Sequence, residues 1–360
     1  MSRPLSFIPG PAKISPAVYQ VIETAAAAGI LELSHRSPEF LEIAKESLQN
    51  LRTYLAIPDD YHILYTESAS SAWHSMVANA VRQKSAHIVQ GAFSGKATTA
   101  ARKLSKRAVE YHCEVPKEAL QLPTAIDTDV ELVTICLNES SNGTRWDMSQ
   151  LQDLRTMAPN ALIGVDVTSC AGAVVLDFAL GDVWYFSVQK AFGLPAGLGV
   201  VILSPRALAQ AKELADTGEN LAGIGNWSDL IANQENGRGP TPYTPNMLSI
   251  YLLARQAARL EAAGGIETTE QATLQKAARI YTYLEKHPTL KPYITHKSNR
   301  SPTVITVTGT PEAIASAHQR AREHNTVLGQ GYGELKQETL RLANFPSITD
   351  EDVASLLAWL

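Results

Sequence analysis

The chain has 360 residues, of which 45% are hydrophobic and 19% are charged, with a formal net charge of -5. This composition is typical of a globular protein with one large domain and a smaller one. The charges form no block of one sign, which gives no electrostatic reason to expect binding to nucleic acid or to an anionic membrane. No stretch reaches the roughly 20 apolar residues of a membrane span. The N-terminal segment lacks the apolar core of a signal peptide, so we predict a cytoplasmic protein.

The three cysteines, Cys113, Cys136 and Cys170, are too few and too scattered for a disulfide framework. They form no CxxC pair. We predict free thiols that are buried or half-buried, and no metal site.

A helical apolar stripe comes first in the chain, at Leu41, Ala44, Leu48, Leu51 and Leu55. From about residue 60 to 205, short apolar strands then alternate with helical segments. The strands are predicted at YHILYT, HIVQ, ELVTICL, LIGVDVTS, VWYFSV and GVVIL. This alternation predicts an α/β domain with a mostly parallel sheet, in which ligands bind beyond the carboxyl ends of the strands.

The last third of the chain reads as helix followed by a second, smaller α/β unit. A long helix is predicted near residues 250–285, from LLARQAARLEAAGG and KAARIYTYLEKH. The tail then has strand, helix, strand and helix, from TVITVTG to ITDEDVASLL. We predict a large domain at residues 16–255 and a small domain made of residues 1–15 and 256–360.

Lys190 is the one charged residue of FSVQKAFGLPAGLGVVIL, residues 186–203. Apolar surroundings lower the pKa of a lysine, and a neutral amine is a nucleophile toward carbonyl groups. A lysine whose ammonium reaches water from a strand end would have the same pattern. Asp166 ends the earlier strand LIGVD. A pyridoxal phosphate ring needs a lysine for its aldehyde and an acid for its pyridinium nitrogen, although Asp166 could equally start a turn or cap a helix.

The stretch TESASSAWHSMV runs from a strand into a helix. Its small residues let backbone N–H groups approach an anion such as a phosphate closely, although a serine-rich helix cap has the same composition; they are Ser68, Ala69, Ser70 and Ser71. Phe93 follows another strand and can stack on a planar ring or belong to the core.

These residues lie in motifs that resemble the class V aminotransferases of fold type I, most closely the phosphoserine aminotransferase family, nearly from end to end. The motifs are FIPGPAKISPAV, SHRSPEF, NESSNG, DVTS, VQKAFGLPAGLGVVIL and YTPNM. The resemblance implies a pyridoxal-phosphate-dependent transferase of fold type I, with a mostly parallel seven-stranded sheet in the large domain and a smaller C-terminal α/β domain. It also implies a homodimer with shared active sites, which transfers an amino group from L-phosphoserine to 2-oxoglutarate in serine biosynthesis.

The resemblance also implies the residues that bind pyridoxal 5′-phosphate. Lys190 would form the internal aldimine and move the proton between Cα and C4′, and Asp166 would keep the pyridinium nitrogen protonated. The other implied contacts are Phe93 stacked on the ring, Ser140 at the phenolic oxygen, and Ala69, Ser70, Gln189 and the other subunit's Thr244 at the phosphate.

For the substrate, the resemblance implies that Arg341 pairs with the α-carboxylate, for which a bidentate guanidinium is suited. His35 and Arg36 would approach the distal acidic group from the partner subunit. Judged without the motif, Arg36 would be a surface ion pair and His35 a structural histidine.

Several positions depart from the family pattern. Ser70 stands where the family has an arginine, Phe93 where tryptophan is common, and Tyr243 where an asparagine precedes the threonine. The Gly-His-Arg that grips the substrate phosphate is missing, and Lys336 in GQGYGELKQET is a partial substitute at most.

The substrate therefore stays open between phosphoserine and alanine, serine or glyoxylate. A cysteine-dependent lyase is disfavoured because no cysteine follows Cys170, and a nicotinamide enzyme because no G-x-G-x-x-G follows an early strand. A metabolite-sensing regulator is disfavoured by the retained Lys190, Asp166 and Arg341.

Overall fold

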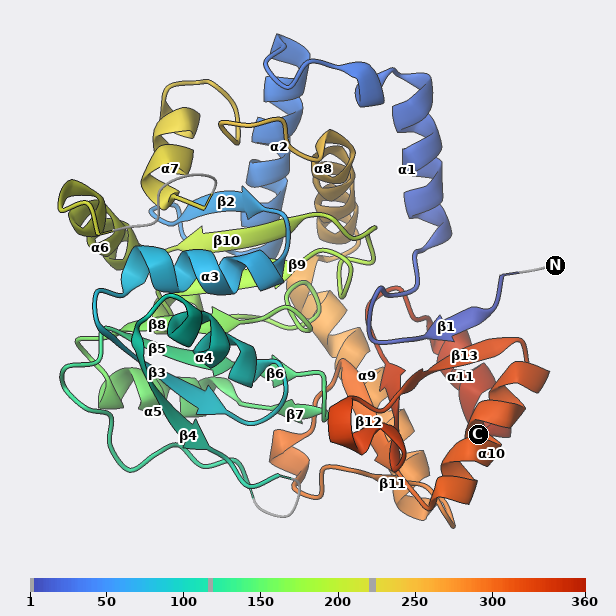
Figure 1. The fold of residues 1–360 in the computed structure, drawn as a ribbon. Coiled ribbons are helices and arrows are strands. Elements are labelled where there is room, and N and C mark those ends of the chain that lie inside the picture. Colours follow the sequence, from blue (N-terminus) through green and yellow to red (C-terminus); the bar gives the residue numbers. More distant parts are fainter. Residues whose placement is uncertain (1–2, 116–118, 220–224) are drawn as a thin grey trace.

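A computed structural model describes residues 3–115, 119–219 and 225–360 and contains two main sheets with helices packed around them (Figure 1). The larger sheet has seven strands. In spatial order they are β2 (His62–Thr66), β10 (Gly199–Leu203), β9 (Val183–Ser187), β8 (Leu162–Asp166), β5 (Leu132–Cys136), β3 (Lys84–Val89) and β4 (Arg107–His112). β10 is antiparallel to both of its neighbours, and the other adjacent pairs are parallel. The predicted seven-stranded, mostly parallel sheet is confirmed.

The central strands read as unbroken apolar runs because helices cover both faces of the sheet. Every residue of β5, β8, β9 and β10 is buried. Sequence reasoning missed β4, since this edge strand is half-exposed and carries charged residues, features that protect an edge from pairing with other chains.

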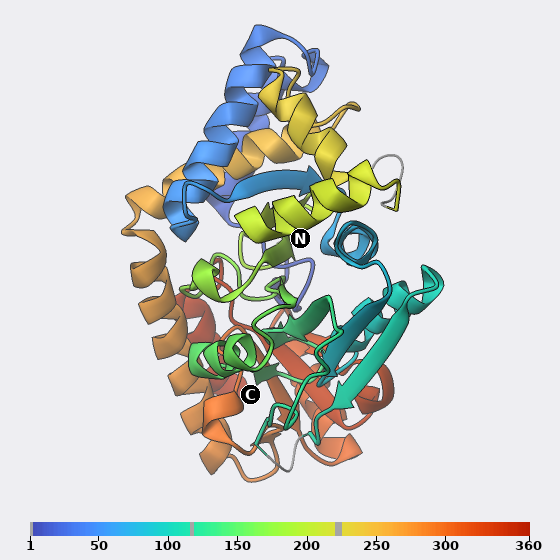
Figure 2. The same ribbon diagram turned by 90° about the vertical axis from the view of Figure 1, so that its left-hand side faces the viewer.

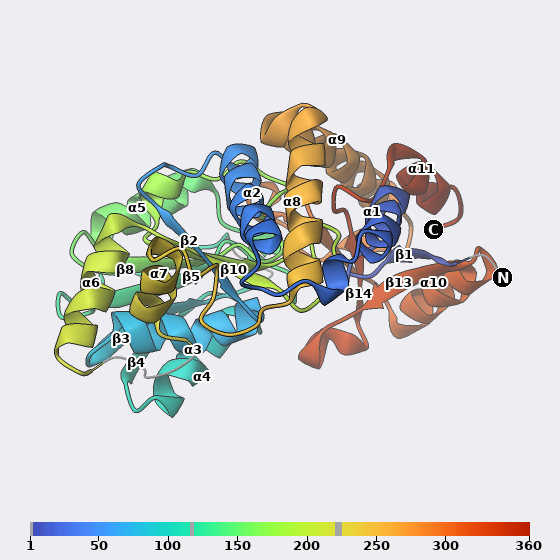
Figure 3. The ribbon, with the colours of Figure 1, turned by 90° about the horizontal axis from the view of Figure 1, so that it is seen from above.

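Two groups of helices enclose the sheet, and Figure 3 shows them on its opposite sides. One face packs against α1 (Pro16–Ala27), α2 (Pro38–Leu55), α5 (Met148–Met157) and α8 (Met247–Ala262). The other face packs against α3 (Ala69–Ala80), α4 (Ser94–Lys103), α6 (Pro205–Asp216) and α7 (Trp227–Glu235). The predicted stripe of leucines lies on α2, where Leu51 and Leu55 are buried.

The smaller sheet has five strands and joins both ends of the chain. Its order is β1 (Leu5–Phe7), β13 (Thr326–Gln330), β14 (Thr339–Ala343), β12 (Val304–Thr308) and β11 (Lys291–Pro292). β1 pairs in parallel with β13, so the start of the chain lies beside its C-terminal part (Figure 1). This sheet packs with α9 (Gly265–Lys286), α10 (Pro311–Glu323) and α11 (Asp350–Trp359), and Figure 2 shows this orange and red part of the chain in the lower half of the molecule. The short elements are the hairpin β6 (Asn138–Glu139) and β7 (Thr144–Arg145), and the single turns η1 (Ile30–Glu32), η2 (Phe178–Leu180), η3 (Lys297–Asn299) and η4 (Gly333–Lys336).

The long helix predicted near residues 250–285 is helical but not continuous. The helix is broken into α8 and α9 at Gly264 and Gly265, whose φ angles of 112° and 74° lie outside the helical region. The predicted domain boundary at residue 255 falls within α8. The division into 16–255 and 1–15 with 256–360 stays a prediction, and residues 1–2, 116–118 and 220–224 of it lie outside the described part.

All three cysteines are free, with Cys136 and Cys170 buried and Cys113 half-buried, as predicted. Among the described residues, none of the helices combines the length and apolar character that a membrane span needs.

Candidate active site

A pocket lies at the carboxyl edge of the seven-stranded sheet, where β8 and β9 end. Seven residues that the family resemblance implies as cofactor contacts line it: Ala69, Ser70, Phe93, Ser140, Asp166, Gln189 and Lys190. They come from helix starts, loops and strand ends that are far apart in the chain, and the parallel sheet brings them to one edge. Five predicted residues are not among the lining residues: His35, Arg36, Thr244, Lys336 and Arg341.

Lys190 lies in the turn between β9 and β10. Its Nζ donates a hydrogen bond to Pro9 O at 2.7 Å. Burial lowers the pKa of Lys190 to about 8, and the charge of Arg341 acts in the same direction, against the carboxylates of Asp166 and Glu139. The amine is therefore partly neutral near physiological pH, as a nucleophile toward carbonyl groups must be.

The N-terminal segment packs directly on the lysine. A Cβ atom at Gly10 would lie 2.5 Å from Lys190 Nζ, so any larger residue would displace the amine. The Ala12 N–H also donates to Gln189 O at 2.8 Å, which ties the segment to the turn that carries Lys190. Sequence reasoning missed this contact, although FIPGP was among the motifs.

Asp166 is the last residue of β8 and is buried. Its carboxylate accepts the Thr168 N–H at 2.8 Å, and it forms no ion pair with any cation in the described part of the chain. Burial raises the pKa of Asp166 to about 6, although hydrogen bonding from Thr168 opposes the increase. A buried carboxylate without an ion pair is suited to bind a protonated nitrogen on a ligand in the pocket.

The N-terminus of α3 forms another wall of the pocket. Ser68 and Ser71 close a capping box, in which the Ser71 N–H donates to Ser68 Oγ at 3.2 Å and the Ser68 N–H to Ser71 Oγ at 3.1 Å. The Ala69 N–H donates to Ser187 Oγ at 2.7 Å. Ser70 is exposed in this first turn, where the helix dipole favours an anion such as a phosphate.

The loops that carry Phe93 and Ser140 are joined by one buried carboxylate, Glu139. Its Oε2 accepts the N–H groups of Phe93 at 3.0 Å and Ser94 at 2.8 Å, at the start of α4. Its Oε1 accepts the N–H and hydroxyl of Ser141. Glu139 therefore fixes the loop after β5 against the loop that presents the Phe93 ring. Sequence reasoning quoted NESSNG but gave Glu139 no role.

Arg341 reaches the edge of the pocket from β14 of the smaller sheet. It donates from Nη1 to Ser140 O at 2.9 Å and from Nε to Gln330 O at 2.8 Å. These bonds leave three of the five guanidinium N–H donors for another acceptor. Its predicted place beside the site of Lys190 is supported by the effect of its charge on the pKa of that lysine.

His35, Arg36 and Thr244 lie close together, away from the residues that line the pocket. The Thr244 hydroxyl is 3.3 Å from His35 Nδ1, and Arg36 donates to Arg238 O and Pro242 O. Lys336 is exposed in η4. Within one chain, the structure therefore does not bring these four residues to the pocket.

The residues at the pocket match the parts of pyridoxal phosphate one by one. The lysine amine suits its aldehyde, the aspartate its pyridine nitrogen, the Phe93 ring its aromatic face and the start of α3 its phosphate. Several buried side-chain oxygens at the pocket, Asn138 Oδ1 and Gln189 Oε1 among them, have no hydrogen-bond partner in the described chain. Buried polar atoms normally have partners, so these oxygens fit a site that receives a polar ligand.

Comparison with known proteins identifies the class. Residues 7–323 match the family described as aminotransferase class-V, and the chain therefore belongs to this family of pyridoxal-phosphate-dependent aminotransferases.

Within that family, the similarity to phosphoserine aminotransferases predicted from the sequence is confirmed. The solved phosphoserine aminotransferase of Cytophaga hutchinsonii is 31% identical, with a TM-score of 0.95 over 100% of this chain and 99% of that one. A phosphoserine aminotransferase of Rhodococcus jostii is 27% identical over 350 residues, which cover 96% of this chain and 91% of the relative. The alanine–glyoxylate aminotransferase of Nostoc sp. is 21% identical with a TM-score of 0.82, covering 99% of this chain and 94% of that one, and so shows a shared fold alone. The predicted fold type I architecture is likewise confirmed.

Proposed function

We propose that this chain transfers the amino group of L-phosphoserine to 2-oxoglutarate, with pyridoxal 5′-phosphate bound in the pocket at Lys190. The observation that carries the proposal is that Lys190 and Asp166 line one pocket, while Arg341 of the smaller sheet donates to the backbone carbonyl of Ser140, another residue of that lining. The relatives named phosphoserine aminotransferase support the choice of substrate.

Each of these residues has a distinct task in the proposed reaction. When bound, the cofactor supplies an aldehyde that carries the amino group and a ring that accepts electrons. Lys190 Nζ, with a pKa of about 8, would move the proton between the substrate α-carbon and the carbon that bears the cofactor's aldehyde. Asp166 holds the proton of the pyridine nitrogen, Phe93 covers the ring face, and Arg341 orients the substrate through its α-carboxylate.

The proposal includes a homodimer in which His35, Arg36 and Thr244 serve the partner's pocket. These residues contact one another and their neighbouring loop instead of the pocket of their own chain, which supports a role across an interface. The predicted cytoplasmic location stays part of the proposal.

A second candidate is a transaminase for alanine, serine or glyoxylate. It is favoured by the position of Lys336, which is exposed and absent from the pocket lining, so the expected substitute for the phosphate grip is not found there.

The test is the half-reaction of the purified, cofactor-loaded enzyme. The enzyme is mixed separately with O-phosphoserine, serine, alanine and glutamate, and conversion of the cofactor to its amine form is followed by absorbance. Conversion by phosphoserine and glutamate supports the proposal. Conversion by alanine or serine with phosphoserine inert would replace it with the second candidate.

Lys190→Ala is the matched control for this assay. It should abolish conversion by every amino acid and change the absorbance of the bound cofactor, because the reacting amine is missing. An unaltered spectrum would remove Lys190 from the mechanism.

A further inference from the structure

Lys96 lies in the first turn of α4, beside the pocket but not assigned to any task above. Its Nζ is 4.5 Å from the centroid of the Phe93 ring, 5.4 Å from that of Trp73 and 5.8 Å from that of Tyr332. It also lies 3.4 Å from the Tyr332 hydroxyl, to which it donates. Three aromatic rings and one hydroxyl thus surround a half-buried ammonium.

This ammonium has no anionic partner in the described part of the chain, because Lys96 takes part in none of the ion pairs found there. Its place in a helical first turn is also unfavourable, because the helix dipole puts positive partial charge there. The nearby carboxylate of Glu139 is occupied by four donors. The aromatic rings attract the ammonium but supply no counter-charge, so the position is suited to an anion from outside the chain.

Lys96 belongs to the same electrostatic group as the catalytic lysine and the carboxylate-binding arginine. Its charge, like that of Arg341, lowers the pKa of Lys190. The Tyr332 ring is shared by both cations, with Arg341 Cζ 5.4 Å and Lys96 Nζ 5.8 Å from its centroid. Two of the rings around Lys96, those of Phe93 and Trp73, line the pocket. Two cations are therefore placed to meet a ligand at the edge of the pocket.

We propose that Lys96, oriented by Tyr332, binds the distal anionic group of the substrate while Arg341 binds its α-carboxylate, and that Lys96 thereby selects amino acids with an acidic side chain. The inference rests on the proposed function and extends it with the residue that recognises the phosphate. It explains how the chain works without the Gly-His-Arg of its relatives and with Lys336 exposed.

The phosphate of the cofactor is the competing ligand for Lys96. The contacts of Lys96 argue for the substrate, because they are with Phe93, with Trp73 in the second turn of α3 and with Tyr332 at the start of η4. None of these contacts is with Ser68, Ala69 or Ser70 at the start of α3. The two possible ligands of Lys96 are distinguished by measuring the affinity of the apoenzyme for the cofactor in the absence of substrate.

The experiment compares Lys96→Met, Lys96→Arg and Lys103→Met with the wild type. Lys103 is an exposed lysine at the end of the same helix and controls for loss of a charge from α4. Half-reactions with phosphoserine, glutamate and alanine give the apparent dissociation constant and the maximal rate for each amino acid. Titration of the apoenzyme with pyridoxal phosphate gives the cofactor affinity.

We expect Lys96→Met to weaken phosphoserine binding by roughly 10- to 100-fold, the value of a hydrogen bond to a charged group, with alanine unaffected. Lys96→Arg should restore most of the affinity, and Lys103→Met should behave as wild type. Equal losses for phosphoserine and alanine, no loss for either, or weaker cofactor binding in Lys96→Met would each overturn the assignment.

The proposed function fails separately, if wild-type enzyme does not convert phosphoserine. Glutamate, whose second carboxylate is also distal, then tests Lys96 independently. A Lys96→Met enzyme that binds glutamate as tightly as wild type would exclude the role of Lys96 in that case too.

Discussion

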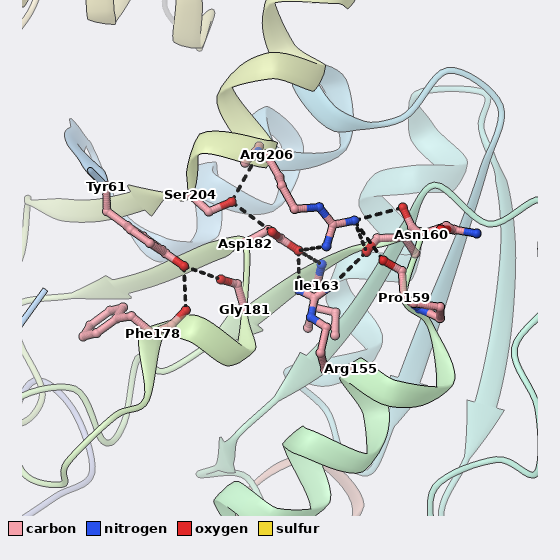
Figure 4. A network of polar contacts seen from close by, with 12 residues as sticks. Tyr61, Arg155, Pro159, Asn160, Ile163, Phe178, Gly181, Asp182, Ser204 and Arg206 are labelled. Carbon is pink, nitrogen blue, oxygen red and sulfur yellow. Dashed lines mark hydrogen bonds and ion pairs between the residues drawn. The ribbon is translucent and has the colours of Figure 1, made fainter. Parts of the chain in front are cut away.

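Two buried aspartates lie at opposite edges of the seven-stranded sheet, and they are held in opposite ways. Asp166 exposes 5% of its surface at the carboxyl end of β8, and Asp182 exposes 3% just before the start of β9. Asp182 accepts hydrogen bonds from Arg155, from the Ile163 N–H at 2.9 Å and from Ser204 Oγ at 2.9 Å, as Figure 4 shows. Asp166 forms no direct ion pair in the described structure and accepts the Thr168 N–H.

This difference in partners distinguishes a buried carboxylate that stabilises the fold, Asp182, from one that is suited to the chemistry, Asp166. A buried carboxylate whose acceptor sites are filled by the chain stabilises the structure only as long as the set is complete. A buried carboxylate that lines a pocket, and whose acceptor sites the chain does not fill, is available to bind a ligand.

Two lysines with a lowered pKa, the half-buried Lys190 and the buried Lys276, repeat the contrast. Burial lowers the pKa of both to about 8. Lys276 Nζ is bound by two carbonyl oxygens, Phe345 O and Ile348 O, whereas Lys190 donates to one and lines the pocket. A lowered pKa therefore does not identify a reactive lysine unless the amine also reaches a ligand site.

The largest expected effect on activity at the carboxyl edge is that of Asp166→Asn. The amide cannot hold the proton of the pyridine nitrogen, so the half-reaction with phosphoserine should slow by roughly 10³-fold or more. The folded structure should be retained, because Asp166 has no counter-charge to lose. A rate within a few fold of wild type, measured by stopped-flow absorbance, would show that the Asp166 carboxylate has no part in the chemistry.

At the amino edge, Asp182→Asn should mainly affect folding. The change leaves the Arg155 guanidinium, 16% exposed, without its counter-charge, and should lower the free energy of unfolding by about 3–5 kcal/mol. Urea denaturation measures this loss, and the rate per folded molecule should stay at the wild-type value. Asp153→Asn, at an exposed position of α5, is the control and should leave stability within about 0.5 kcal/mol. If the two variants were equally stable, the network in Figure 4 would not stabilise the fold.

The pH dependence of stability should separate Asp166 from the other acids of the protein. Burial raises the pKa of Asp166 from 3.8 to about 6, so the folded apoenzyme holds this proton more tightly than the unfolded chain. Its contribution to stability is therefore intact below about pH 4 and is lost as the pH rises to about 6, a loss of about 3 kcal/mol. The difference in unfolding free energy between wild-type and Asp166→Asn apoenzymes, followed from pH 4 to 7, measures it. A difference that does not change with pH would mean that Asp166 is not buried as an unpaired acid.

The sequence was sufficient for the central strands of the larger sheet and for several residues at its carboxyl edge. Strand ends are local features of the chain, so Asp166, Phe93 and Lys190 could be selected from the order of residues alone, whereas Ser140 was implied by the family resemblance. Contacts made by distant segments could not be predicted in this way. The pairing of β13 with β1, the packing of Gly10 on Lys190, and the contact of Lys96 with Tyr332 all depend on how the smaller sheet docks. The place of Lys336 in the sequence suggested a ligand contact; η4 leaves this lysine exposed and outside the pocket lining, and its role stays a prediction.

The smallest expected effect is that of Arg206→Gln, at the outer side of the Asp182 network. The Arg206 guanidinium is 46% exposed and its Nη1 is 3.8 Å from Asp182, while its Nη2 donates to the backbone carbonyls of Pro159 and Asn160 (Figure 4). Solvent screens this pair, so the loss in unfolding free energy should be below about 1 kcal/mol. Arg155→Gln, which removes the buried partner of the same carboxylate, should cost several-fold more in the same urea titration. If Arg155→Gln and Arg206→Gln lowered the unfolding free energy equally, burial of the ion pair would not explain how the Asp182 network stabilises the amino edge of the sheet.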